Sequence, residues 1–121
     1  MKRELVGVLL VLSLTGCAVI DARRVRQMSS LELKEAFQPC VSPLGVSREL
    51  AERQTSQLPE GRLAFIPLPH PTLVSDGYVH FLHVDRERGH VYLTQVGGYA
   101  GRRTIYGPLS LRSHCVSSAG S

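Results

Sequence analysis

Five histidines give this chain its clearest potential for metal chemistry. His80 and His83 lie three residues apart in a predicted β-strand, so their side chains should point to opposite faces and cannot bind one ion together. A hairpin that pairs Asp85 with His90 would bring the side chains of Asp85 and His90 near that of His83, on the same face at the end of the hairpin. Zinc sites need three or four such ligands and an ordered second shell. Because the turn between Asp85 and His90 is charged and solvated, we predict no metal site there.

A glycine-rich segment followed by two arginines is a second candidate site. Its backbone N–H groups could form a nest for an anion, and the arginines could bind a carboxylate or phosphate of a partner. The segment lacks the Gly-Lys-Ser/Thr of a Walker A motif, and no helix follows it as the dinucleotide fingerprint requires. A plain hairpin loop with glycines at positive φ explains the same pattern, and both interpretations stay open. The candidate residues are Gly97, Gly98, Gly101, Arg102 and Arg103.

No pattern typical of an enzyme stands out. The chain has no Gly-x-Ser-x-Gly nucleophile elbow. Ser75-Asp76 lies near His70 and His80 in the sequence, but a triad needs geometry that sequence proximity does not provide. The chain is also small for enclosing an active site. We therefore predict a protein that is not an enzyme and has no cofactor.

The first seventeen residues carry the most specific motif. A basic start followed by a short apolar run is typical of a secretory signal. The run closes on Leu14-Thr15-Gly16-Cys17, which resembles the lipobox of bacterial lipoproteins: a leucine, two small residues and a cysteine. The resemblance implies that residues 1–16 are removed, that the Cys17 thiol carries diacylglycerol, and that the new amine is usually acylated. It also implies a place in the cell envelope.

The alternative for this segment is an uncleaved membrane anchor. A spanning helix needs about 20 apolar residues. The run here is shorter and contains Gly7, Ser13 and Thr15, so its length suits a signal better. Ala18 follows the cysteine, whereas lipoproteins retained in the inner membrane usually have Asp there. We therefore expect a protein held by lipid in the outer membrane and facing the periplasm.

The two other cysteines, Cys40 and Cys115, form an even pair in what would be an oxidising compartment. We predict that they form a disulfide between the two edges of the folded domain. A buried unpaired thiol or a metal ligand is the alternative for each. Neither lies in a Cys-x-x-Cys spacing, and only Cys115 has a neighbouring histidine, His114.

The charge pattern argues against nucleic acid as a partner. Cleavage would remove Lys2, Arg3 and Glu4 from 14 basic and 10 acidic residues, which leaves 12 against 9. These charges are interspersed, and neither a concentrated basic face nor an aromatic-basic motif is present. Residues 17–28 should form the lipidated cysteine and a flexible basic tether. Its arginines could contact an anionic leaflet or simply keep the tether solvated.

Two short helices are predicted next. Ser29 and Glu32 have the spacing of a capping box, and an apolar stripe follows before Pro39 ends the helix. A second helix should begin after Ser47 and continue to about Gln57, although its apolar stripe is thin.

From Leu63 the pattern changes to strands. Residues 63–66 should form a short edge strand that ends at Pro67. Residues 78–84 and 91–96 flank the best hairpin signal, in which Gly89 is left-handed. That register gathers four apolar residues on one face: Leu82, Val84, Val91 and Leu93. Residues 103–106 should form a further strand, with Gly107-Pro108 leading to residues 109–111.

These elements predict an α+β domain over residues 29–116, with two short helices followed by an antiparallel meander of about four strands and one disulfide. Residues 117–121 should be a disordered tail.

Two classes of function fit. The first is a non-catalytic protein-binding module in envelope or secretion-machine assembly. The second is an immunity or inhibitor lipoprotein that blocks a periplasmic toxin or cell-wall hydrolase with one protruding loop, for which Gly97–Arg103 is the candidate. Contact through hydrophobic strand edges near Phe65 or Tyr106 is the alternative to the arginine loop. The expected partners are the membrane, through the lipid, and an envelope protein, without nucleic acid or a small-molecule cofactor.

Overall fold

The computed structural model describes residues 21–70, 76–98, 101–111 and 115. The lipobox with Cys17, residues 17–20 of the expected tether and the tail at 117–121 lie outside the described residues. Within the described ranges, no helix has the length and apolar character needed to cross a membrane.

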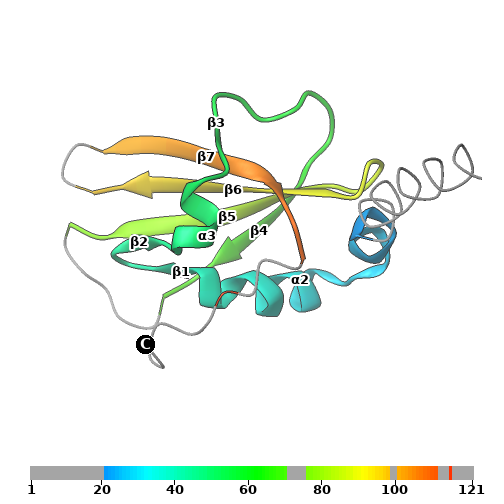
Figure 1. The fold of residues 1–121 in the computed structure, drawn as a ribbon, viewed down its shortest axis with the longest axis horizontal. Coiled ribbons are helices and arrows are strands. Elements are labelled where there is room, and N and C mark those ends of the chain that lie inside the picture. Colours follow the sequence, from blue (N-terminus) through cyan, green and yellow to red (C-terminus); the bar gives the residue numbers. More distant parts are fainter. Residues whose placement is uncertain (1–20, 71–75, 99–100, 112–114, 116–121) are drawn as a thin grey trace, which may run out of the picture.

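The fold is α+β, as predicted, with a five-stranded antiparallel sheet in the order β3-β7-β6-β5-β4 and a separate two-stranded hairpin, β1-β2 (Figure 1). The meander therefore has one strand more than expected, because a short segment after α3 joins the sheet. The elements are α2 (Ser30–Phe37), η1 (Gln38–Cys40), β1 (Val41–Ser42), β2 (Gly45–Val46), α3 (Arg48–Ala51), β3 (Gln54–Thr55), β4 (Ala64–Leu68), β5 (Tyr78–Asp85), β6 (His90–Gly97) and β7 (Arg102–Leu109).

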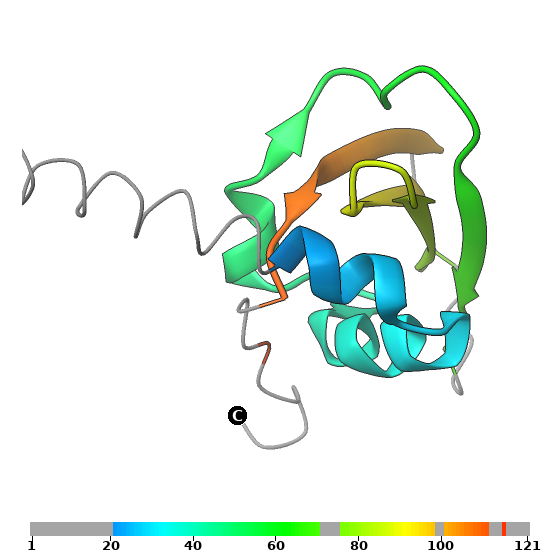
Figure 2. The same cartoon turned by 90° about the vertical axis from the view of Figure 1, so that its right-hand side faces the viewer.

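Helix α2 begins with the predicted capping box. The Ser29 hydroxyl accepts from the N–H of Glu32 at 3.1 Å, and the Glu32 carboxylate accepts from the N–H of Ser29 at 3.1 Å. Pro39 then converts the last turn into the 3₁₀ helix η1. Leu33 and Phe37 are buried on the side that faces the sheet. Figure 2 shows α2 and the helical residues 21–27 on the same side of the curved sheet.

The expectation of a flexible tether over residues 17–28 is wrong for residues 21–28. Residues 21–27 are helical, and Val25 belongs to the core with 2% of its surface exposed. The Arg86 guanidinium donates to the carbonyl oxygens of Val25 and Met28, which ties the end of this helical segment to the turn between β5 and β6. The packed domain therefore includes residues 21–28, which precede position 29, the start given by the capping box.

The second predicted helix is also shorter than expected. Helix α3 ends at Ala51 instead of near Gln57, and only Leu50 of its residues is buried. The chain then pairs with the edge of β7, where Gln54 lies opposite Tyr106 and Thr55 opposite Ile105. A thin apolar stripe gives a helix little tertiary support, whereas the open strand edge offers backbone partners.

The β5–β6 hairpin has the predicted register. Asp85 lies opposite His90, and the four apolar side chains on the inner face are completely buried: Leu82, Val84, Val91 and Leu93. Gly89 is left-handed at φ +71°, and a Cβ there would collide with the backbone of Ala22. Glycine is therefore required both by the turn and by the helix packed against it.

Strands β4 and β7 both continue through a proline. Strand β4 is an edge strand, as predicted, but continues through Pro67 to Leu68. Pro67 fits because an edge strand has no partner on one side to demand its missing N–H. Strand β7 likewise continues through Gly107 and Pro108 to Leu109.

The predicted disulfide joins Cys40 to Cys115, whose Cα atoms are 4.9 Å apart across 75 positions of sequence. Cys40 is buried at the end of η1, next to the β1–β2 hairpin. The bond therefore ties the helical layer to the segment that follows the last strand.

Candidate functional site

The histidines considered for metal binding are separated in the fold. His80 points into the core, whereas the Nε2 atom of His83 lies 2.9 Å from the Thr94 hydroxyl on the opposite face. Asp85 forms an ion pair with Arg88 at 2.9 Å instead of facing His90 as a ligand. Among the described residues, no group of three His, Cys, Asp or Glu side chains is arranged to hold a metal ion.

The glycine-arginine loop has features of a structural turn. Gly97, Gly98 and Gly101 all have positive φ, at 120°, 73° and 62°. The N–H of Gly98 donates to the Gly77 carbonyl and that of Gly101 to the Gly98 carbonyl, so these two donors are not free for an anion. The side chains of Arg102 and Arg103 are exposed, while residues 99–100 lie outside the described part.

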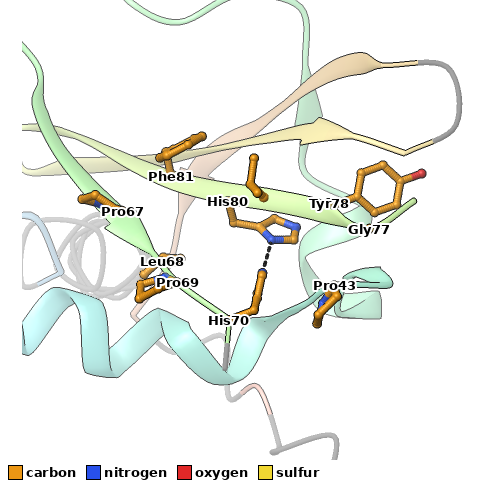
Figure 3. Close-up of a pocket in the computed structure, with 10 residues that line it drawn as sticks. Pro43, Pro67, Leu68, Pro69, His70, Gly77, Tyr78, His80 and Phe81 are labelled. Atoms are coloured by element: carbon orange, nitrogen blue, oxygen red, sulfur yellow. Dashed lines mark hydrogen bonds between the residues drawn. The ribbon is translucent and has the colours of Figure 1, made fainter. Parts of the chain in front are cut away.

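A pocket that the sequence patterns did not reveal lies beside the end of β4 and the start of β5 (Figure 3). Its volume is about 170 Å³, and its walls are mostly apolar. The lining includes three prolines, the rings of Tyr and Phe, and two imidazoles: Pro43, Pro67, Pro69, Tyr78, Phe81, His70 and His80. Figure 3 shows the His70 ring directed at the ring of His80.

A chain of hydrogen bonds runs from the core to this pocket. The Nε2 atom of His80 lies 2.9 Å from Oε1 of Gln95, and its Nδ1 atom lies 2.8 Å from Nε2 of His70. Because an amide oxygen only accepts, His80 must carry its proton on Nε2. Its Nδ1 then accepts from the Nε2–H of His70. This leaves Nδ1 of His70 without a proton, as a hydrogen-bond acceptor.

Burial keeps the two imidazoles of this hydrogen-bond chain neutral. The pKa of His80 is lowered to about 4, mainly by burial and to a smaller extent by the neighbouring His70, against the opposing effect of the Gln95 hydrogen bond. Burial also lowers the pKa of His70. At neutral pH both imidazoles are therefore uncharged. The arrangement can hold an uncharged polar ligand atom, and no carboxylate among the described lining residues could serve as a catalytic partner.

Part of this chain of hydrogen bonds could have been predicted from the sequence. The register that pairs Asp85 with His90 also pairs His80 with Gln95, and strand alternation places His80 on the same face as Leu82. The contact between His70 and His80 could not be predicted, because it depends on the direction that the backbone takes after β4 ends at Leu68.

Aromatic side chains also gather on the outer face of the sheet. Phe65 on β4 is 58% exposed and stacks on Phe81 of β5, with ring centroids 4.9 Å apart. The His83 ring meets Phe65 edge-on at 5.7 Å. Tyr106, the other residue expected near a hydrophobic edge, is only 6% exposed because it belongs to the core, and β3 pairs with the edge of β7 on which it lies. The expectation of an edge at Tyr106 is therefore wrong.

Comparison with protein-family models, with curated proteins and with solved structures finds no match for this chain.

The buried histidine predicts a loss of stability in acid. With the folded-state pKa of His80 at about 4 and an unfolded value near 6.5, the unfolded state binds a proton that the folded state excludes between these values. Stability is therefore present above about pH 6.5 and falls as the pH drops, by about 2 kcal/mol between about pH 7 and pH 5. Urea unfolding of residues 18–121 at several pH values measures this.

The pKa values of His70 and His83 are lowered as well, so the comparison needs a variant that isolates His80. His80→Gln should show a clearly smaller difference between the two pH values, whatever its absolute stability. An equal pH dependence in this variant and the wild type would contradict the assignment.

Proposed function

We propose that this chain is a lipoprotein anchored through Cys17 in the outer membrane, where it acts as a non-catalytic protein-binding module in envelope or secretion-machine assembly. The lipobox resemblance supports the anchor. The observation that best supports binding is the exposed ring of Phe65 on the edge strand β4, which stacks on the half-buried Phe81 of β5. With Val79, which is also exposed, these residues define the β4 edge surface.

The β4 edge surface combines two features of partner-contact sites. Its aromatic rings offer large apolar area at low entropic cost, and aromatic residues are enriched where proteins meet. Its central residue, Phe65, also lies on an edge strand whose outer side has no strand partner in the described sheet. Large apolar side chains exposed next to each other on a small domain indicate an interaction site.

Pro67 determines how a partner would bind there. A partner strand that paired with β4 would meet no N–H donor at Pro67, so a continuous hydrogen-bonded ladder is not available. We therefore assign the contact mainly to the side chains of Phe65, Val79 and Phe81. Such an interface depends little on salt, in contrast to one based on Arg102 and Arg103.

Affinity capture from detergent-solubilised envelopes, followed by binding measurements with the identified partner, tests this proposal. Phe65→Ser should weaken binding about tenfold or more, because an aromatic anchor at an interface contributes at least about 2 kcal/mol. The matched control is Leu31→Ser, which removes an equally exposed apolar side chain (61%) from helix α2 and should leave affinity unchanged. Raising the salt concentration should have little effect.

A variant of the arginine loop provides the contrasting test. If Arg102→Ala/Arg103→Ala weakens binding and salt slows association, while Phe65→Ser has no effect, the β4 edge surface is not the contact site. Because all of these side chains are exposed, each variant should retain the fold, which the thermal transition can verify.

One observation favours the second candidate function, an immunity or inhibitor lipoprotein. Leu44 at the tip of the β1–β2 hairpin is 83% exposed. The hairpin is held by the adjacent disulfide at Cys40 and by a hydrogen bond from the Tyr78 N–H to the Pro43 carbonyl at 2.9 Å. A rigid protruding tip of this kind could enter an active site. Capture of a toxin or cell-wall hydrolase whose binding requires Leu44 would support this function over the first.

A further inference from the structure

We infer that the pocket beside His70 binds a flat aromatic group carrying one N–H or O–H donor, such as an indole ring, and that this donor bonds to the Nδ1 atom of His70. The pocket shares Val79 and Phe81 with the β4 edge surface, but free small molecules test this ligand site without a protein partner.

The size of the pocket limits the ligand to one ring system. Pockets for drug-sized ligands have volumes of about 300–1,000 Å³. The pocket here has about 170 Å³ and is partly open to solvent. It can therefore take one ring system, either free or as a side chain of a larger molecule.

The walls favour a flat apolar group. The rings of Pro43, Pro67 and Pro69 present apolar surfaces, and Tyr78 and Phe81 add aromatic ones. Aromatic rings gain from packing against other rings in addition to the area they bury. A charged ligand would lose its hydration among these side chains without an opposite charge to replace it.

The hydrogen-bond chain supplies the polar specificity. Gln95 and His80 are buried and bonded to each other, and they fix the proton of His70 on the nitrogen that faces His80. None of the described residues donates to the other nitrogen, Nδ1. Because His70 lines the pocket, we assign this atom as the acceptor that a ligand would meet there, and it would select ligands that bring a donor. Because burial lowers the pKa of His70, the ring remains an acceptor at neutral pH.

The same chemistry occurs in free heteroaromatic molecules and in the tryptophan side chain of a partner. A comparison of indole with N-acetyltryptophanamide distinguishes these sources. If both bind, the pocket accepts a side chain of a protein, and if indole alone binds, it is a site for free small molecules.

The test uses NMR titration of isotope-labelled residues 18–121, which include every described core residue. The probes are indole and 1-benzothiophene, which has a similar shape but no N–H donor. Indole should shift the His70 nitrogen signals, with Nδ1 changing most. It should also bind about tenfold more tightly than benzothiophene, because an unpaired acceptor in a buried contact costs about 1–3 kcal/mol.

Two variants complete the design. His70→Leu keeps an apolar wall without the acceptor and should abolish the preference for indole. His83→Leu removes a histidine from the outer face, away from the pocket lining, and should retain it. Equal affinity of the wild type for the two probes, no binding of either probe, or an unchanged preference in His70→Leu would each overturn the inference.

Discussion

Replacing Cys40 by serine is expected to lower the free energy of unfolding by about 2–4 kcal/mol. The disulfide to Cys115 connects positions 75 residues apart, so its loss greatly increases the entropy of the unfolded chain. Residual structure in the unfolded state keeps the effect below the ideal loop-closure value. Because a domain of this size has only about 5–15 kcal/mol of total stability, such a loss is large.

Urea unfolding of residues 18–121 measures the change, with mass analysis under non-reducing conditions to verify the bond. Cys115→Ser and the double variant serve as controls. If one bond accounts for the effect, the double variant should be hardly less stable than either single variant. Two free thiols in the wild-type protein, or fully additive losses, would contradict the prediction.

Signals that act over a few residues predicted much of the fold. The capping box at Ser29 and Glu32 places the start of α2, because both of its hydrogen bonds are local. The hairpin register follows from Gly89 and from the four apolar residues that must share a face. The edge position of β4 follows from Pro67.

Features that depend on distant residues were missed. Residues 21–28 are charged enough to suggest a tether, and they become part of the domain because Val25 packs into the core and Arg86 donates to the carbonyl oxygens of Val25 and Met28. Strand β3 exists because the edge of β7 is available to it, and no local pattern near Gln54 indicates this. In both places tertiary contacts override a weak local preference.

The candidate site was predictable in part. The correct register already places His80 opposite Gln95 on the core face, which marks a buried polar pair. The third member, His70, reaches this pair from the end of β4, ten residues before His80 in the sequence. Pro43 joins the pocket from the β1–β2 hairpin, which no sequence signal placed beside β5.

The largest expected effect on the protein in the cell comes from Cys17→Ser. If Leu14-Thr15-Gly16-Cys17 acts as a lipobox, this substitution removes the thiol that carries the diacylglycerol. Each buried methylene of an acyl chain contributes about 0.8 kcal/mol to membrane binding, so the loss of two or three chains releases the domain from the membrane. Cys40→Ser, which also removes one thiol, is the matched control and should leave the lipid in place.

Metabolic labelling with a fatty-acid probe, followed by membrane fractionation, tests the central claim most directly. The wild type and Cys40→Ser should give a labelled band in outer-membrane fractions, and Cys17→Ser should give none. A wild-type protein that is unlabelled and found in the soluble fraction would contradict the lipid anchor, and with it the proposed role at the membrane.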